Sequence, residues 1–213
     1  GRREADQVRI MAMSVVGLGL HEVGHDEDAV SVRETELAML RRIGAPATNI
    51  LIAQGNLATT YRALGRFEEA LSLRRDVYSG KLRLYGEENE ETLRATLNYA
   101  DSLTSLEHFE EAKTLLLKAM PVARQVLGEN HEDTLRLKWI YATALCRDDG
   151  ATLAELREAV TTLEEVEQNI QRVFGRAHPL TGGIGGDLRN ARVALAARDV
   201  EALGDALGAL GAA

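Results

Sequence analysis

The sequence has little of what several protein classes require. Among its 213 residues there are one Cys and three Pro, and aromatic residues make up 4% of the chain. A single Cys cannot form a disulfide within the chain, which excludes a disulfide-stabilised mini-domain. The scarcity of aromatic residues and Pro argues against an all-β sandwich. No run reaches the roughly 18 apolar residues that a membrane-spanning helix needs. The lone Cys146 is compatible with a reducing compartment, and we predict a cytoplasmic protein.

Ala, Leu, Glu and Arg dominate the composition, which favours helix throughout the chain. The chain is 45% hydrophobic and 27% charged, which is ordinary for a globular protein. Its net charge of −8 argues against nucleic acid and anionic membranes as partners. The chain begins with Gly1 rather than Met, so we expect a fragment of a longer protein.

A period of about forty residues runs along the chain. The words EENEETLRA (87–95) and ENHEDTLRL (129–137) are nearly the same and stand one period apart. Glycines that follow an apolar and charged run recur at nearly constant intervals, at Gly44, Gly86, Gly128 and Gly175. Repeats of this length, each a helix–turn–helix, are typical of an α-solenoid.

Residues 51–73 show one repeat most clearly. Apolar or small residues recur with helical spacing on either side of Gly65, where a left-handed backbone would end the first helix. The two stripes are Leu57, Ala58, Tyr61 and Leu64, then Phe67, Ala70, Leu71 and Leu73. Neither helix can bury its stripe alone, so the pair requires neighbours of the same kind.

This repeat resembles the tetratricopeptide repeat in the 42-residue form of kinesin light chains. The resemblance rests on Asn56-Leu57-Ala58, Tyr61 and the run 64–70, Leu-Gly-Arg-Phe-Glu-Glu-Ala. A linker of the form Leu-Gly-x-x-His-x-x-Thr occurs at 127–134 and, with Phe in place of Leu, at 174–181. The resemblance implies an all-α solenoid of about five antiparallel helix pairs that form a right-handed superhelix.

We predict a single domain, 1–213, with repeats near 5–43, 48–84, 90–126, 132–173 and 178–210. The ten expected helices are 5–22, 26–43, 48–63, 67–84, 90–105, 109–126, 132–147, 152–173, 186–197 and 200–210. Asn89 or Asn130 is expected to cap a helix. In the third repeat Glu107 replaces the turn glycine, and four glycines within 182–186 are expected to delay or fray the helix there.

His21-Glu22-Val23-Gly24-His25 matches the H-E-x-x-H motif of zinc proteases. That chemistry needs both histidines on one face of one helix. The period places Gly24 at the turn equivalent to Gly65, so we expect His25 to lie off the helix that carries His21. A zinc hydrolase at His21 and His25 is therefore the least favoured of our hypotheses.

The resemblance implies that the first helix of each pair lines a concave, ligand-binding surface. Asn56 and Asn98 would then hydrogen-bond the backbone of an extended peptide. Arg62, Arg94 and Arg136 would make the surface locally basic and favour an acidic peptide or a chain terminus as ligand, or would simply be solvated. The predicted binding residues are Asn56, Thr59, Arg62, Arg94, Asn98, Asp101, Arg136 and Trp139, with Leu97 and Thr104 among the further positions on this surface. Trp139 is alternatively a core residue.

The leading hypothesis is a scaffold without catalytic activity or cofactor, which binds a peptide or protein in its concave groove. The alternative is self-assembly, through an apolar surface formed by Leu203, Leu207 and Leu210, or service as the sensor or scaffold arm of a larger protein. The first hypothesis predicts a protein partner, and the second predicts a homo-oligomer.

Overall fold

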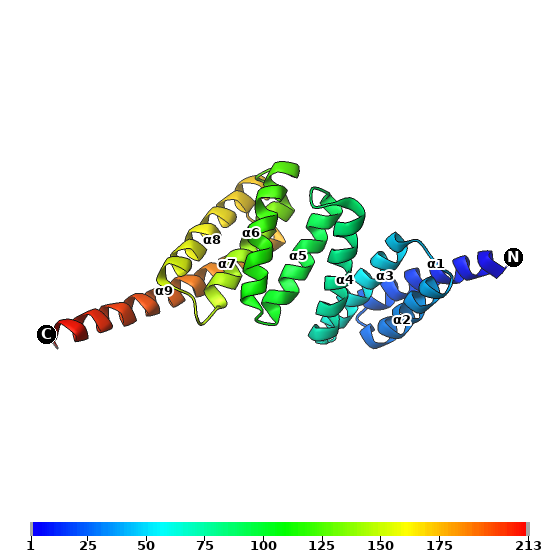
Figure 1. Cartoon of the computed structure of the whole chain (residues 1–213), viewed down its shortest axis with the longest axis horizontal. Coiled ribbons are helices and arrows are strands. Elements are labelled where there is room, and N and C mark those ends of the chain that lie inside the picture. The colour runs from blue at the N-terminus through cyan, green and yellow to red at the C-terminus, as the bar shows by residue number, and fades with distance from the viewer. Residues whose placement is uncertain (1, 212–213) are drawn as a thin grey trace. The chain divides into compact units, whose positions relative to one another are not determined.

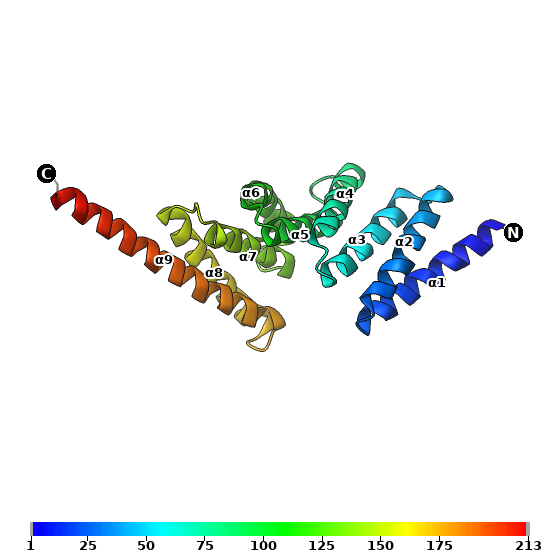
Figure 2. The same cartoon turned by 90° about the horizontal axis from the view of Figure 1, so that it is seen from below.

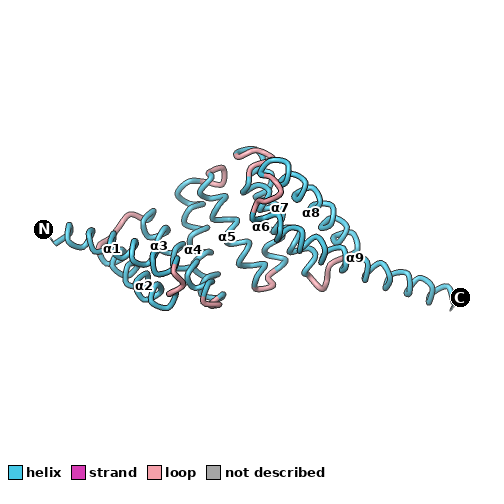
Figure 3. The backbone as a smooth tube through the Cα atoms, turned by 180° about the vertical axis from the view of Figure 1, so that it is seen from behind, coloured by secondary structure: helices cyan, strands magenta, loops and turns pink. Residues whose placement is uncertain are grey.

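In a computed structural model that describes residues 2–211, the chain contains nine helices and no strand within that range (Figure 1). The helices are α1 (Arg2–Glu22), α2 (Asp26–Arg42), α3 (Ala47–Ala63), α4 (Phe67–Tyr85), α5 (Glu90–Ser105), α6 (Phe109–Val126), α7 (Glu132–Arg147), α8 (Leu153–Phe174) and α9 (Pro179–Gly211). Short loops join them (Figure 3). None of these helices is long and apolar enough to cross a bilayer.

The chain divides into two compact units, Gly1–Leu106 and Glu107–Ala213. In the first unit, which holds α1 to α5, each of the helices α1 to α4 packs on the next one along the chain. In the second unit α6 packs on α7, α7 on α8, and α9 on both α8 and α7. The all-α solenoid of antiparallel pairs is confirmed, and the first eight helices lie close to their predicted bounds. The single domain stays a prediction.

The turns within the first three pairs, at Gly24, Gly65 and Glu107, share a left-handed residue. Gly65 has φ 73°, its N–H donates to Arg62 O at 3.0 Å, and the N–H of Arg66 donates to Tyr61 O at 2.8 Å. This pair of bonds is the Schellman motif, which satisfies carbonyls at the helix end. Glu107 lies one period after Gly65 and takes the same left-handed backbone, with φ 63°. The period therefore imposes the turn even where glycine is missing.

Two helices, α5 and α7, begin with a side-chain cap at equivalent positions of the period. The side chain of Asn89 accepts from the N–H of Glu91 at 2.9 Å and caps α5, as predicted. The prediction that Asn130 is a cap is wrong. His131, one period after Asn89, caps α7 by accepting from the N–H of Asp133 at 3.2 Å.

The predicted helices 186–197 and 200–210 are wrong, because one continuous helix, α9, spans both. Figure 2 shows it as an unbroken helix that runs along α8 and continues past it. Neither Gly nor Pro stands at 197–201 to stop the helix. The glycines at 182–186 lie inside α9, because Ile184, Leu188 and Ala191 form a buried stripe whose packing offsets the weak helix propensity of glycine.

Two of these glycines should respond differently to alanine. A Cβ on Gly182 would meet nothing within 4 Å, so G182A should raise the free energy of unfolding by about 0.5–1 kcal/mol. A Cβ on Gly183 would lie 2.9 Å from the ring of Trp139, so G183A should lose that gain and displace the ring. Trp139 is the only Trp, so its fluorescence reports the displacement directly. Equal stabilisation and unchanged emission in both variants would contradict the packing of α9 on α7.

Candidate functional site

The exposed face shared by α3 and α5 is the candidate site, and both helices belong to the first unit. The sequence prediction placed six of its residues here, and the structure brings all six to this face. Arg62 of α3 and Asp101 of α5 lie 3.7 Å apart, which shows that the two helices are neighbours. All six are exposed except the half-buried Asp101: Asn56, Thr59, Arg62, Arg94, Asn98 and Asp101.

Buried arginines hold the backbone of both asparagines. Arg33 of α2 donates from Nη1 to the main-chain oxygen of Asn56. Arg74 of α4 donates from Nη1 to the main-chain oxygen of Asn98 at 2.8 Å. Both arginines are buried, with exposed fractions of 4% and 8%. Each second helix therefore fixes one asparagine of the first helix that follows it.

Arg33 and Arg74 each stand four positions after a fully buried alanine, Ala29 or Ala70. Burial lowers the pKa of both guanidinium groups, and nearby carboxylates act in the opposite direction. Arginine keeps its charge at neutral pH, so each guanidinium is a charged hydrogen-bond donor inside the repeat. The sequence prediction missed this pair, although the recurrence of arginine at the same place after the repeat alanine was visible.

The side-chain amides of Asn56 and Asn98 are exposed, and among the described residues neither makes a hydrogen bond. Each amide offers a donor and an acceptor to solvent. Thr59 lies one turn after Asn56, and its hydroxyl donates a hydrogen bond to the main-chain oxygen of Gly55 at 3.1 Å. The two asparagines are thus the polar groups of this face that remain open to a ligand backbone.

The arginines of the face lie beside carboxylates. Arg62 pairs with Asp101, and Arg94 lies 2.8 Å from Glu90 and 3.4 Å from Glu91 on its own helix. Two positive and three negative side chains give this group no net positive charge. In the second unit Arg136 lies 4.0 Å from Glu132. An acidic partner stays a prediction, and these ion pairs weaken it.

Trp139 and Arg136 lie on α7 in the second unit. The indole N–H of Trp139 donates to Asp187 Oδ2 of α9 at 2.7 Å, and the hydroxyl of Thr143 donates to the same oxygen at 3.2 Å. Cys146 is half-buried nearby, and burial together with the charge of Asp187 raises the pKa of its thiol to about 11. Trp139 therefore packs under α9, in line with the core alternative. The prediction missed Asp187 as its partner because it placed the start of that helix at residue 186.

Two further positions expected on the concave surface are buried. Leu97 is 1% exposed and Thr104 is 4% exposed, and the hydroxyl of Thr104 donates to the main-chain oxygen of Ala100 at 3.0 Å. Both lie on the side of α5 that packs into the repeat rather than on its exposed face. Placing them on the concave surface was wrong.

The histidines of the H-E-x-x-H match lie on separate elements, as predicted. His21 is in the last turn of α1, and its Nδ1 lies 2.5 Å from Asp26 Oδ1. Gly24 takes φ 78° in the turn, and His25 is the N-terminal flanking residue of α2. Within residues 2–211 no three His, Cys, Asp or Glu side chains are grouped to hold a metal ion.

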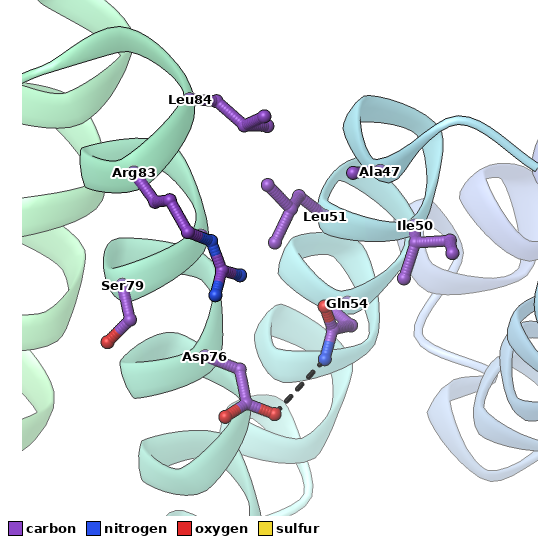
Figure 4. Close-up of a pocket in the computed structure, with 9 residues that line it drawn as sticks. Ala47, Ile50, Leu51, Gln54, Asp76, Ser79, Arg83 and Leu84 are labelled. Atoms are coloured by element: carbon purple, nitrogen blue, oxygen red, sulfur yellow. Dashed lines mark hydrogen bonds between the residues drawn. The ribbon is translucent and has the colours of Figure 1, made fainter.

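A cavity of about 440 Å³ lies between α3 and α4 and was not predicted (Figure 4). Its polar wall includes Gln54 and Asp76, joined by a hydrogen bond of 3.2 Å from Nε2 to Oδ2. Gly80 also lines it, and a Cβ at this position would lie 2.5 Å from a methyl group of Leu51. A glycine in mid-helix was the one sequence signal for this close approach.

Residues 49–125 match the family model of the tetratricopeptide repeat. Among solved structures, the chain is similar to the nearly identical TPR-like repeats of a predicted kinesin light chain from Podosopora anserina. The identity is 21% and the TM-score 0.70, over 90% of this chain and 89% of that one. For a substituted form of those repeats the identity is 21% and the TM-score 0.72, over 96% of this chain and 95% of that one. For BtubC (BKLC) from P. vanneervenii the identity is 17% and the TM-score 0.66, over 93% of this chain and 84% of that one. No curated protein sequence matches the chain.

Proposed function

We propose that this chain, which carries tetratricopeptide repeats over residues 49–125 and shares the fold of kinesin-light-chain-like repeats, binds an extended segment of a partner protein. The binding face is the exposed side of α3 and α5. Proteins built on this fold generally mediate protein–protein interactions. The chain would act as a scaffold, and the proposal includes no reaction.

The observation that carries the proposal is the pair of open asparagine amides on this face. Asn56 and Asn98 are one period apart, and each stands on a backbone that a buried arginine holds in place. An extended peptide needs partners for both its N–H and C=O groups, and asparagine supplies both kinds. Because the scaffold is fixed beforehand, little conformational freedom is lost when the peptide binds.

The ion pairs of the face support recognition by main-chain hydrogen bonds rather than by charge. An acidic ligand would have to displace Asp101 from Arg62, or Glu90 from Arg94, before it gained a contact. Such an exchange of one exposed ion pair for another yields little free energy. We therefore expect the affinity to change little between low and moderate salt.

The test uses a library of random linear peptides displayed on phage and panned against the immobilised chain. Enriched peptides should bind the double variant N56A/N98A about tenfold or more weakly, because each lost hydrogen bond contributes about 1 kcal/mol. Isothermal titration calorimetry with a synthetic copy of the peptide measures the difference.

The control is N169A, which removes an asparagine from α8 in the second unit and should leave the affinity unchanged. Circular dichroism confirms that the variants keep their helices. If the enriched peptides bind N56A/N98A as tightly as the parent chain, recognition does not use these amides and the proposed site is wrong.

A further inference from the structure

The outer side of α1 carries uncovered apolar residues over most of its length. Val8, Met11 and Val15 are 65%, 69% and 71% exposed, and Val16 and Leu18 are about half exposed. They follow each other at helical spacing, and Ala12 and Gly19 on the same helix are also exposed. An apolar surface of this kind on a soluble helix marks an interaction site.

The period shows that the equivalent surface is covered elsewhere in the chain. Ala12, Val16 and Gly19 correspond to three positions in each later first helix, one, two and three periods on. All nine of those residues are buried: Ala53, Leu57 and Thr60 on α3, Ala95, Tyr99 and Ser102 on α5, and Leu137, Tyr141 and Ala144 on α7. Among these four helices only α1 leaves the three positions exposed.

On α3 and α5 this surface receives the second helix of the preceding repeat. Tyr78 of α4 stacks on Tyr99 of α5 with ring centroids 5.7 Å apart, and Arg75 donates to the hydroxyl of Tyr99 at 3.0 Å. On α3, Leu57 shares a buried cluster with Val30 and Leu37 of α2. The chain itself therefore shows what kind of element covers the surface: an amphipathic second helix of a repeat.

The last part of α9 has the apolar face of such a helix, and that face is uncovered. Beyond the stripe that packs in the second unit, Val193, Val200, Leu203 and Leu207 are 70%, 69%, 63% and 67% exposed. Their positions repeat with the heptad-like spacing of a helix-packing seam, which places them on one face. Leu210, which the sequence prediction also placed on this surface, has a side chain outside the described residues.

The charges of the two segments are complementary. The α9 segment 193–207 carries three acidic residues against one basic residue, Arg198, whereas residues 1–9 carry three Arg against two acids. Opposite charge favours encounter of the two segments and weakens as salt is added.

We propose that the chain associates head to tail, with the segment 193–207 of α9 in one copy covering Val8–Leu18 of α1 in the next. Each contact continues the packing of repeat on repeat. Because the two surfaces differ, one copy keeps a free α1 and its neighbour a free α9, so the association is open-ended or closes as a ring. This surface is separate from the face of Asn56 and Asn98, so its failure leaves the proposed function intact.

The test combines V16E on α1 with L203E on α9, and sedimentation equilibrium measures the mass. The parent chain should show a mass that rises with concentration above that of the 23.2 kDa monomer. Each single variant should be monomeric, because a buried unpaired carboxylate opposes docking. An equimolar mixture of V16E and L203E should form a dimer and stop there, because the mixture offers one intact α1 and one intact α9.

The control is L117E, at an exposed residue of α6 that belongs to neither surface, and it should associate like the parent chain. Circular dichroism shows whether each variant is folded, and the peptide affinity of V16E should match that of the parent. A monomeric parent chain at every concentration overturns the proposal. So does continued association of either single variant alone, which would indicate that α1 or α9 pairs with its own kind, or a mixture that stays monomeric.

Discussion

Replacing Arg74 by alanine is expected to lower the free energy of unfolding by about 2–4 kcal/mol. Its guanidinium lies inside the first unit, where Nη1 donates to Asn98 O at 2.8 Å, to Ser102 Oγ at 2.7 Å and to Asp101 Oδ2 at 3.3 Å. R74A removes these charge-assisted bonds and leaves a cavity where the side chain was. Losing one member of a buried ionic pair costs about 3–5 kcal/mol. Asp101 is 38% exposed on its side chain, which lowers the expected loss.

The repeats themselves supply a matched control for this variant. Four positions after Ala112 and Ala159, where the first two repeats have arginine, stand Leu116 and Leu163, both fully buried. Leucine thus packs well at this position, and R74L should lose the hydrogen bonds without the cavity. We expect R74L to cost about half as much as R74A, measured by urea unfolding. An R74A variant as stable as the parent chain would show that Arg74 does not hold Asn98 in place.

Replacing Lys113 by methionine is expected to lower the free energy of unfolding at neutral pH by about 2 kcal/mol. Lys113 of α6 is buried, and its Nζ lies 3.0 Å from Asp148, 3.4 Å from Glu155 and against Glu110. It thereby ties α6 to the turn before α8 and to the first turn of α8. Methionine keeps the apolar stem but leaves these carboxylates without their cation, and the partial exposure of Asp148 and Glu155 limits the cost.

The pH dependence separates this ion-pair role from simple packing. Hydrogen bonding from Lys113 lowers the pKa of Asp148, and the hydrogen bonds of Thr152 together with Lys113 lower the pKa of Glu155. Burial alone would lower the pKa of Lys113, but hydrogen bonds to Glu110 and Asp148 raise it overall. Carboxylates with lowered pKa stabilise the fold above their unfolded pKa of about 4, and the gain is lost as pH falls through their folded pKa. The lysine contribution persists at neutral pH.

Thermal unfolding of the parent chain and K113M across the acidic range measures this dependence. The difference between the two proteins should be largest near neutral pH and should shrink once Asp148 and Glu155 are protonated. A difference that stays constant from neutral pH to strong acid would mean that Lys113 acts through its packing alone.

The sequence predicted the helix bounds correctly where they depend on local residues and on the repeat period. Gly65 and its equivalents end helices through their own backbone, and Asn89 caps through its own side chain, so the first eight helices were predictable. The course of α9 depends on tertiary contacts instead. The glycines at 182–186 weaken a helix in isolation, and only the burial of Ile184 and Leu188 overrides them. Such packing cannot be read from a local propensity.

The candidate site also has some features that the sequence predicted and others that it did not. The period places Asn56 and Asn98 on an exposed face, and the structure does so too. The carboxylates beside the arginines were only partly predictable. Glu90 and Arg94 have the i, i+4 spacing on one helix that is known to pair, whereas Arg62 and Asp101 meet only because α3 and α5 are neighbours. The prediction of a locally basic face did not take these carboxylates into account.

The most direct test of the proposed binding face is site-specific photocrosslinking with a peptide enriched from the library. A photoreactive amino acid replaces Thr59, which is exposed on α3 between Asn56 and Arg62, or, as control, Ser72, which is exposed on α4. Mass spectrometry of the irradiated complexes measures the adduct at each position. Binding on the face of α3 and α5 predicts a strong adduct at 59 and none at 72. A strong adduct at 72 with none at 59 would contradict it.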